Sequence, residues 1–172
     1  MHNIEACIAP LSNKSPIAYG IDLAKYTDYT VITGIDENGY VCYVNRFQAD
    51  WMQTMSVIEK VIGRIPCFVD STGVGDPIVE NLQRILPNIE GFKFTSQSKQ
   101  QIIEGLVMAV QTQKVFFPLE PIGYEMNNIE YEYTRTGVKY SAPPGLHDDC
   151  VMSLALAYDC SIKNKKSTFL FS

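Results

Sequence analysis

The sequence predicts an α/β domain built on a mixed β-sheet, and two patterns predict it. First, three runs rich in β-forming residues follow one another, and Asn38-Gly39, a dipeptide typical of hairpin turns, joins the last two. Second, two shorter apolar runs alternate with segments of helical periodicity, which favours parallel strands added through crossover helices. The strands are expected at residues 17–23, 29–35, 40–47, 67–69 and 89–94.

Helices are predicted where apolar residues recur every three to four positions behind a start signal. Asp50 opens the first such segment, and Asp76-Pro77 supplies a cap and a first helical residue for the second. Around Thr136-Gly137, polar and β-forming residues alternate as they do in a hairpin. The expected helices are 50–62, one that starts at 76, 98–113, 121–128 and 147–160, and the expected additional hairpin is 130–140.

Net charge limits the kinds of nucleic-acid binding that the chain can support. Its 172 residues suit one domain, and 14 basic against 19 acidic residues give a formal net charge of −5. This sign excludes a histone-like protein that binds DNA by broad neutralisation of phosphates. It is compatible with an enzyme that meets DNA through divalent cations, because bound cations cancel the charge of clustered carboxylates.

Cysteine and histidine usage argues against a disulfide framework and against a zinc site. The five cysteines are odd in number and form no Cys-x-x-Cys pair, and the sequence holds two histidines, His2 and His147. We therefore expect buried free thiols in a reducing compartment. No apolar run approaches the ~20 residues of a membrane span, and the N-terminus lacks a signal-peptide pattern. These patterns place the chain in the cytoplasm, with no membrane partner.

Acidic residues stand at the ends of otherwise apolar segments. Asp22 interrupts a run with the composition of a buried central strand, where an uncompensated charge is costly. Asp70 ends the strand at 67–69, and the carboxyl end of a parallel strand opens onto the crevice where ligands bind. Asp148 and Asp149 open a helix whose small, apolar residues would let it pack flat on the sheet. We expect these acids to converge.

Converging carboxylates with no Lys or Arg beside them in sequence are typical of a site for hard cations, since oxygen ligands suit Mg²⁺ and Mn²⁺. Two such ions about 3.5–4 Å apart hold a scissile phosphate, lower the pKa of an attacking water and stabilise the departing 3′ oxygen. His147 would orient a metal-bound water or a ligand carboxylate. The expected metal ligands are Asp22, Asp70, Asp149 and Asp148.

Each acid also has a purely structural explanation. Asp22 could belong to a polar loop, Asp70 could cap the turn that follows it, and the pair at 148 and 149 could cap its own helix. Acids at two strand ends and one helix start together favour a metal-dependent nuclease. Gly73 and Gly75 form no phosphate-binding loop, because no Lys-Ser/Thr ending follows them.

Basic residues near these segments are candidates for contacts with the DNA backbone. For each one alone, solvated surface charge is the alternative. The candidates are Lys99, Arg135, Lys139 and Lys93.

In their order, spacing and apolar context, the acidic motifs resemble those of the nuclease domain of the large terminase subunit of tailed bacteriophages and prophages. The resemblance runs from about residue 16 to residue 160 and is carried by residues 19–24, 28–31, 69–77, 98–99, 147–149 and 152–157. It implies a ribonuclease-H-like fold, in which helices flank a mixed five-stranded core sheet and an extra β-hairpin lies near the active site.

The resemblance also implies a function, an endonuclease that cuts double-stranded viral DNA during genome packaging with two Mg²⁺ or Mn²⁺ ions. By matching motifs, Asp22, Asp70 and a third acid hold the ions, with Asp149 preferred to Asp148. The implied partners are a terminase ATPase domain, the small terminase subunit and the portal protein, in the host cytoplasm.

The large terminase subunits that the chain resembles normally carry an ATPase motor ahead of the nuclease. We therefore interpret the chain as an excised domain or a prophage remnant. Residues 1–15 are expected to be a linker or lead-in, residues 16–161 the nuclease domain and residues 162–172 a C-terminal tail.

Three other functions compete with this interpretation. A Holliday-junction resolvase or a transposase core would use the same fold and a similar set of acids. A non-catalytic module that docks a packaging complex on its portal would need no metal. A phosphate binder related to sugar kinases or actin is a third, weaker alternative.

Overall fold

The computed structural model describes residues 3–24, 28–74 and 76–170. Their centre is one five-stranded sheet in the order β3-β2-β1-β4-β5. The first three strands are antiparallel neighbours, whereas β4 and β5 are added parallel to β1. The strands are β1 (Ala18–Asp22), β2 (Thr30–Ile35), β3 (Val41–Phe47), β4 (Cys67–Asp70) and β5 (Ile89–Phe92). The mixed sheet predicted from sequence is confirmed.

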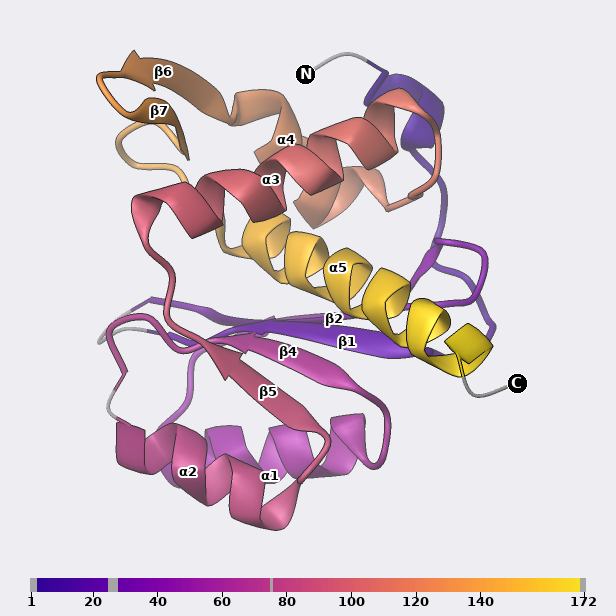
Figure 1. The fold of residues 1–172 in the computed structure, drawn as a ribbon, viewed down its shortest axis with the longest axis vertical. Coiled ribbons are helices and arrows are strands. Elements are labelled where there is room, and N and C mark those ends of the chain that lie inside the picture. Colours follow the sequence, from indigo (N-terminus) through magenta and orange to yellow (C-terminus); the bar gives the residue numbers. More distant parts are fainter. Residues whose placement is uncertain (1–2, 25–27, 75, 171–172) are drawn as a thin grey trace.

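Helices cover both faces of this sheet (Figure 1). On one face lie α1 (Trp51–Ile62) and α2 (Asp76–Ile85), which connect the parallel strands. The other face carries α5 (Asp149–Leu170), with α3 (Ser96–Gln111) packed across α5. A short helical turn, η2 (Leu119–Gly123), leads into α4 (Tyr124–Asn128) beside them. The hairpin of β6 (Glu130–Thr134) and β7 (Gly137–Ser141) forms a separate two-stranded sheet.

Helix α5 lies against the centre of the sheet because small residues on both sides allow a close approach. Gly20 in β1 has no room for a side chain, since a Cβ there would overlap the Ser153 carbonyl oxygen and the Ala157 backbone nitrogen of α5. The Ser153 hydroxyl is buried and lies 2.8 Å from the Gly20 carbonyl oxygen and 2.9 Å from the Thr33 hydroxyl. We call this contact of Gly20 in β1 with Ser153 and Ala157 in α5 the small-residue seam. It fixes the position of the first turn of α5 relative to the ends of the strands.

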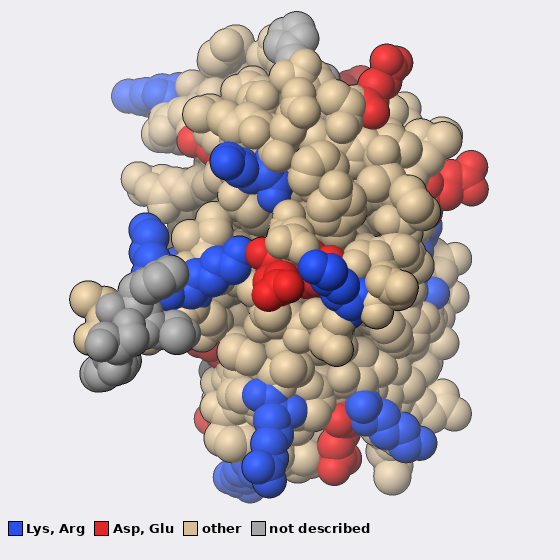
Figure 2. All heavy atoms as spheres, turned by 90° about the vertical axis from the view of Figure 1, so that its right-hand side faces the viewer, with Lys and Arg blue, Asp and Glu red and all other residues tan. Residues whose placement is uncertain are grey.

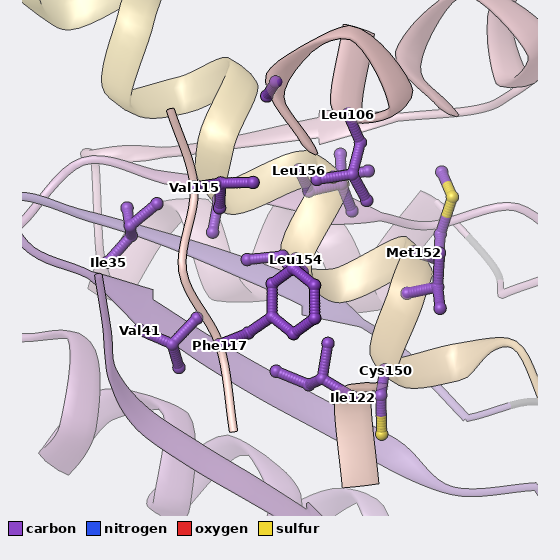
Figure 3. Packing of buried hydrophobic residues seen from close by; sticks show 14 of the residues in the cluster. Ile35, Val41, Leu106, Val115, Phe117, Ile122, Cys150, Met152, Leu154 and Leu156 are labelled. Atoms are coloured by element: carbon purple, nitrogen blue, oxygen red, sulfur yellow. The ribbon is translucent and has the colours of Figure 1, made fainter. Parts of the chain in front are cut away.

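The apolar core forms one cluster on each face of the sheet. The larger cluster joins α5 and α3 to the sheet and to the extended segment at Val115 and Phe117, which are both fully buried (Figure 3). The smaller cluster lies between the sheet and the helices α1 and α2, around Ile58 and Leu82. The helix expected at 50–62 is confirmed as α1, and Asp50 is its cap, because its carboxylate accepts the amide of Gln53 at 2.8 Å.

The segment expected to be a lead-in, residues 1–15, differs from that expectation where the structure describes it. Ile4 and Cys7 are buried in the larger core cluster. The amide of Ala9 donates to the Phe117 carbonyl, and the amide of Phe117 donates to the Cys7 carbonyl, each at 3.0 Å. Burial of these apolar side chains therefore makes the segment part of the packed domain. The apolar residues of this segment show no sustained periodicity in the sequence.

The last helix is also longer than predicted. We expected it to end at Cys160 and a tail to follow, whereas α5 continues to Leu170. No glycine or proline occurs after Gly145, so nothing in the sequence stops the helix, and Lys163 pairs with Asp159 one turn earlier at 2.9 Å. The Lys165 ammonium reaches the Glu37 carbonyl oxygen at 2.8 Å, which holds this end of α5 near the β2–β3 turn.

All five cysteines are free thiols, as the sequence predicts, and four of them are buried. Cys42 is the partly exposed one. Within residues 3–24, 28–74 and 76–170, we find no helix with the length and apolar content that a membrane span requires.

Candidate metal centre

The carboxyl ends of β1 and β4 bring Asp22 and Asp70 together. The two strands are parallel neighbours, and the register pairs Asp22 directly with Asp70. Each acid ends a strand whose preceding residues are buried in the core. The apolar residues thus fix the strands, and parallel pairing carries both carboxylates to the same edge of the sheet.

The start of α5 adds two further acids at this edge. Burial raises the pKa of the Asp22 carboxyl well above its usual range, and the nearby carboxylate of Asp70 raises it further. The carboxylates of Asp149 and Asp148 have the same effect on the Asp22 pKa, while the Lys99 ammonium opposes them. The other three acids that the sequence singled out are therefore all within electrostatic reach of Asp22.

Local contacts differ among the acids. Asp70 Oδ1 accepts the Thr72 amide at 2.8 Å, so this carboxylate also holds the turn after β4. Asp148 forms an ion pair with Lys99 at 3.4 Å, a contact between residues 49 positions apart that sequence did not reveal. Asp149 Oδ2 is buried and makes no hydrogen bond, and the His147 Nδ1 atom stands 3.7 Å away.

Burial also raises the pKa of Asp149, and the Asp148 carboxylate adds to that increase. His147 and Arg46 act in the opposite direction. Within the described part of the chain, no three His, Cys, Asp or Glu side chains are close enough to hold one metal ion as they stand. The candidate centre is thus a group of neighbouring acids rather than a finished ligand set.

The comparisons with known proteins relate the chain to one kind of viral protein. The sequence matches no established protein-family profile. It is 31% identical to the large terminase subunit of Thermus virus P23-45 in an alignment 152 positions long, which covers 81% of this chain and 30% of that protein. The chain therefore spans about 30% of the length of this curated relative, and the same holds for the large terminase subunit of Thermus phage G20c.

Solved structures identify which part of the relative this chain resembles. The large terminase nuclease from thermophilic phage G20c, solved with bound magnesium, superposes with a TM-score of 0.77 and 26% identity over 92% of this chain and 95% of that one. The same nuclease with bound cobalt gives a TM-score of 0.78 over the same shares of both chains. The chain belongs to the family of large-terminase nuclease domains. As in these nuclease domains, its five-stranded sheet and flanking helices form a ribonuclease-H-like fold.

In this terminase nuclease domain, the sequence analysis did not identify a group of residues that contact the first turn of α5 and one another. Glu125 is 5% exposed, and its Oε2 atom accepts the amides of Cys150 at 2.8 Å and Val151 at 3.2 Å. Arg46 from β3 lies 4.0 Å from Glu125 Oε1 and covers the ring of Tyr29 at 4.1 Å. No local pattern marks these residues, because their contacts join α4, β3 and α5 across long stretches of sequence.

The basic residues predicted to contact DNA fall into three places. Lys99 lies in α3 at the acidic edge, whereas Lys139 is exposed on β7 and Arg135 is exposed in the hairpin turn. Between the start of α3 and the hairpin lies a groove of about 620 Å³, which Lys99 and Lys139 both line. The amide of Val138 donates to Gln100 Oε1 at 2.9 Å and fastens the hairpin to α3. Lys93 is exposed between β5 and α3.

The acids and the hairpin lie at the same side of this nuclease domain. In Figure 1, the carboxyl ends of the parallel strands, the first turns of α3 and α5, and the hairpin are all on the left. Figure 2 looks onto the other side, where α5 ends, and shows basic side chains interspersed with acidic ones. A broad basic surface is not visible on that side, in agreement with the net charge of −5.

Proposed function

We propose that this chain is a metal-dependent endonuclease that cuts double-stranded DNA during viral genome packaging. One observation carries the proposal: the β1–β4 register pairs Asp22 with Asp70, and α5 begins at the same edge with Asp149. Packing that places carboxylates side by side is costly unless a cation or a proton compensates their charge. Membership of the terminase nuclease family supports the same function.

The residues at this edge fit a divalent cation in two respects. All donors are carboxylate oxygens, which hard cations prefer. Asp149 Oδ2 is a buried oxygen without a hydrogen-bond partner. We propose that Asp22, Asp70 and Asp149 hold two Mg²⁺ or Mn²⁺ ions. Asp148 is a less suitable ligand, because its carboxylate is paired with Lys99.

Divalent cations bound there would lower the pKa of an attacking water and stabilise charge on the scissile phosphate and the leaving oxygen. The protein's own side chains position the reactants. His147 stands 3.7 Å from the Asp149 carboxylate and, as the proposed orienting residue, would hold its direction. The Lys99 ammonium reduces the negative charge of the edge through Asp148, which favours the approach of a DNA phosphate.

We propose that one strand of the DNA backbone lies along the groove between α3 and the hairpin, where Lys139 contacts it. Arg135 and Lys93 would contact neighbouring phosphates on either side. Lys139→Ala should weaken DNA binding several-fold and reduce the slope of log K against log salt by about 1, because one phosphate contact is lost. Fluorescence anisotropy with a short duplex at several salt concentrations measures both quantities. Lys60→Ala, an exposed residue of α1 on the other face of the sheet, is the control and should leave the slope unchanged.

A plasmid-nicking assay tests the proposed function. The chain should convert supercoiled plasmid to nicked and linear forms with Mg²⁺ or Mn²⁺, and EDTA should stop the reaction. The same assay on linear duplex and on four-way junctions separates a terminase nuclease from a junction resolvase, since a strong preference for junctions would contradict the packaging function. Failure to cut any DNA at any concentration of either metal would contradict the nuclease function.

The packaging role also implies partners. Since the chain spans about 30% of the length of its curated relatives, we propose that the nuclease acts together with a terminase ATPase domain, a small terminase subunit and a portal protein in the host cytoplasm. Binding to a portal without any affinity for metal would instead indicate a docking module. Calorimetry with Mn²⁺ distinguishes the two.

A further inference from the structure

Helix α5 begins at the candidate metal centre, and its first turn needs hydrogen-bond acceptors. Asp148 is the residue before the helix, and its carbonyl oxygen accepts the Met152 amide at 2.9 Å. In a helix of this kind, the side chain at Asp148 would usually accept the amides of Cys150 or Val151. This is the structural explanation that competes with a catalytic role for the acids at the helix start.

The structure gives the capping role to a different residue. Glu125, from α4, accepts both amides through its Oε2 atom. The Asp148 carboxylate is paired with Lys99 instead, and Asp149 Oδ2 has no hydrogen-bond partner. Because a remote carboxylate satisfies the first turn of α5, the two acids at its start are not required as caps.

Glu125 is itself held in place from the sheet. The Arg46 guanidinium, from β3, lies over the ring of Tyr29 and 4.0 Å from Glu125 Oε1, an ion pair without a hydrogen bond to that oxygen. The Tyr29 ring in turn meets the His147 ring edge-on, with centroids 5.6 Å apart. These contacts connect α4, β3 and the residues before α5, so the position of Glu125 fixes the backbone on which Asp149 stands.

We propose that Glu125 is a positioning residue for the metal centre: by capping α5 in place of Asp148, it fixes the helix start and leaves Asp149 available as a metal ligand. This inference rests on the proposed function. Glu125 touches neither the substrate nor the ions, and it acts through the backbone of Cys150 and Val151. The acceptor oxygen of Glu125 is the property that matters for this role.

Two substitutions separate the acceptor from the volume of the side chain. Glu125→Met keeps the length of the side chain and removes the acceptor, whereas Glu125→Gln keeps one acceptor oxygen. We expect Glu125→Met to weaken Mn²⁺ binding roughly 10- to 100-fold, as loss of a residue that orients a ligand does. Glu125→Gln should stay within about threefold of the wild type. Calorimetric titration of the full chain with MnCl₂ alone, at a temperature where each variant is folded, measures the affinities.

Cleavage kinetics give a second measurement that a general loss of stability would not change. For Glu125→Met, the Mn²⁺ concentration at half-maximal rate should rise with the dissociation constant, and kcat at saturating Mn²⁺ should recover most of the wild-type value. Asp50→Ala is the matched control, because it removes a carboxylate cap from α1 on the other face of the sheet. It should lower the Tm by roughly 2–4 °C and leave the Mn²⁺ affinity unchanged.

The outcomes distinguish this inference from the proposed function. If the wild type binds Mn²⁺ and Glu125→Met binds it equally well, the positioning role is overturned and the metal centre stands. If Glu125→Gln binds as weakly as Glu125→Met, capping is not the route by which Glu125 acts. If the wild type binds no Mn²⁺, the proposed function and the positioning role are both overturned.

Discussion

Asp22→Asn should reduce metal-dependent DNA cleavage at least ~100-fold and raise the Tm of the metal-free protein. The loss of activity follows because an amide is a poorer ligand than a carboxylate for a hard cation, and metal catalysis contributes several kcal/mol to such a reaction. The gain in stability follows because burial and the neighbouring Asp70 carboxylate both disfavour the charged form of Asp22. Plasmid nicking and thermal unfolding in EDTA measure the two effects.

The stability effect of Asp22→Asn should depend on pH in a defined direction. The folded-state pKa of Asp22 is raised, so the folded protein binds this proton more tightly than the unfolded chain does. The stability that Asp22 contributes is therefore present below the unfolded pKa of about 4 and is lost as pH rises through the folded pKa. In EDTA, the Tm of Asp22→Asn should exceed that of the wild type by an amount that grows as pH rises through this range and reaches roughly 2–4 °C or more at neutral pH.

Glu80→Gln is the control for this prediction. Glu80 is an exposed acid of α2, on the other face of the sheet from α5. The exchange removes the same charge from the protein but should change neither cleavage nor the pH dependence of the Tm. An Asp22→Asn variant that cleaves DNA at the wild-type rate would refute the assignment of Asp22 as a metal ligand.

Gly20→Ala should destabilise the fold by about 3 kcal/mol or more, which corresponds to a loss of roughly 6–12 °C in Tm for a chain of this size. A Cβ at Gly20 would overlap backbone atoms of Ser153 and Ala157 in α5, and backbone atoms cannot rotate away as side chains do. The helix would have to move off the sheet, and the acids at its start would move with it. Thermal unfolding of the metal-free protein measures the loss.

Gly105→Ala is the matched control for the seam between α5 and β1. Gly105 lies in α3, and apart from its chain neighbours and the nearby backbone of its own helix, nothing stands within 4 Å of the position that its Cβ would take. The same exchange should therefore stabilise the protein by about 0.5–1 kcal/mol, because alanine favours a helix more than glycine does. If the two variants shift the Tm by equal amounts, the close approach at Gly20 does not hold α5 in place.

The sequence predicts most of the fold because the signals that define it are local. The β-rich runs, the Asn38-Gly39 turn and the cap at Asp50 each act within a few residues, and the structure shows a strand, turn or helix at each of them. The acids could be found for the same reason, since each stands at the end of an apolar segment. That β1 and β4 are neighbours is a finding of the structure, because two strands and a helix separate them in the sequence.

The remaining features depend on contacts between distant residues, which leave no periodic pattern. In the sequence, Glu125 is one acid in a polar stretch, and only the packing of α4 beside α5 gives it a partner. Lys99 likewise has no partner near it in sequence, and its contact with Asp148 depends on the position of α3. The same holds for Ile4 and Cys7, whose burial depends on the segment at Phe117. Local sequence therefore identifies the proposed ligands but not the residues that hold them.

The small-residue seam connects the fold to the candidate site. Because Gly20 has no side chain and Ser153 is small, α5 can lie directly on β1, and its first turn then stands beside the carboxyl end of that strand. A larger residue at either position would separate Asp149 from Asp22. The apolar core thus determines the spacing of the acids, although none of the acids contributes to the core.

Joint binding of divalent cations by the acids at this edge is the central claim. Anomalous diffraction from a crystal soaked in MnCl₂ tests it directly. We expect anomalous peaks within coordination distance of the carboxylates of Asp22 and Asp70, with an Asp149 oxygen as a further ligand and Asp148 still paired with Lys99. Peaks only at other surfaces, or none at this edge at saturating Mn²⁺, would contradict the account.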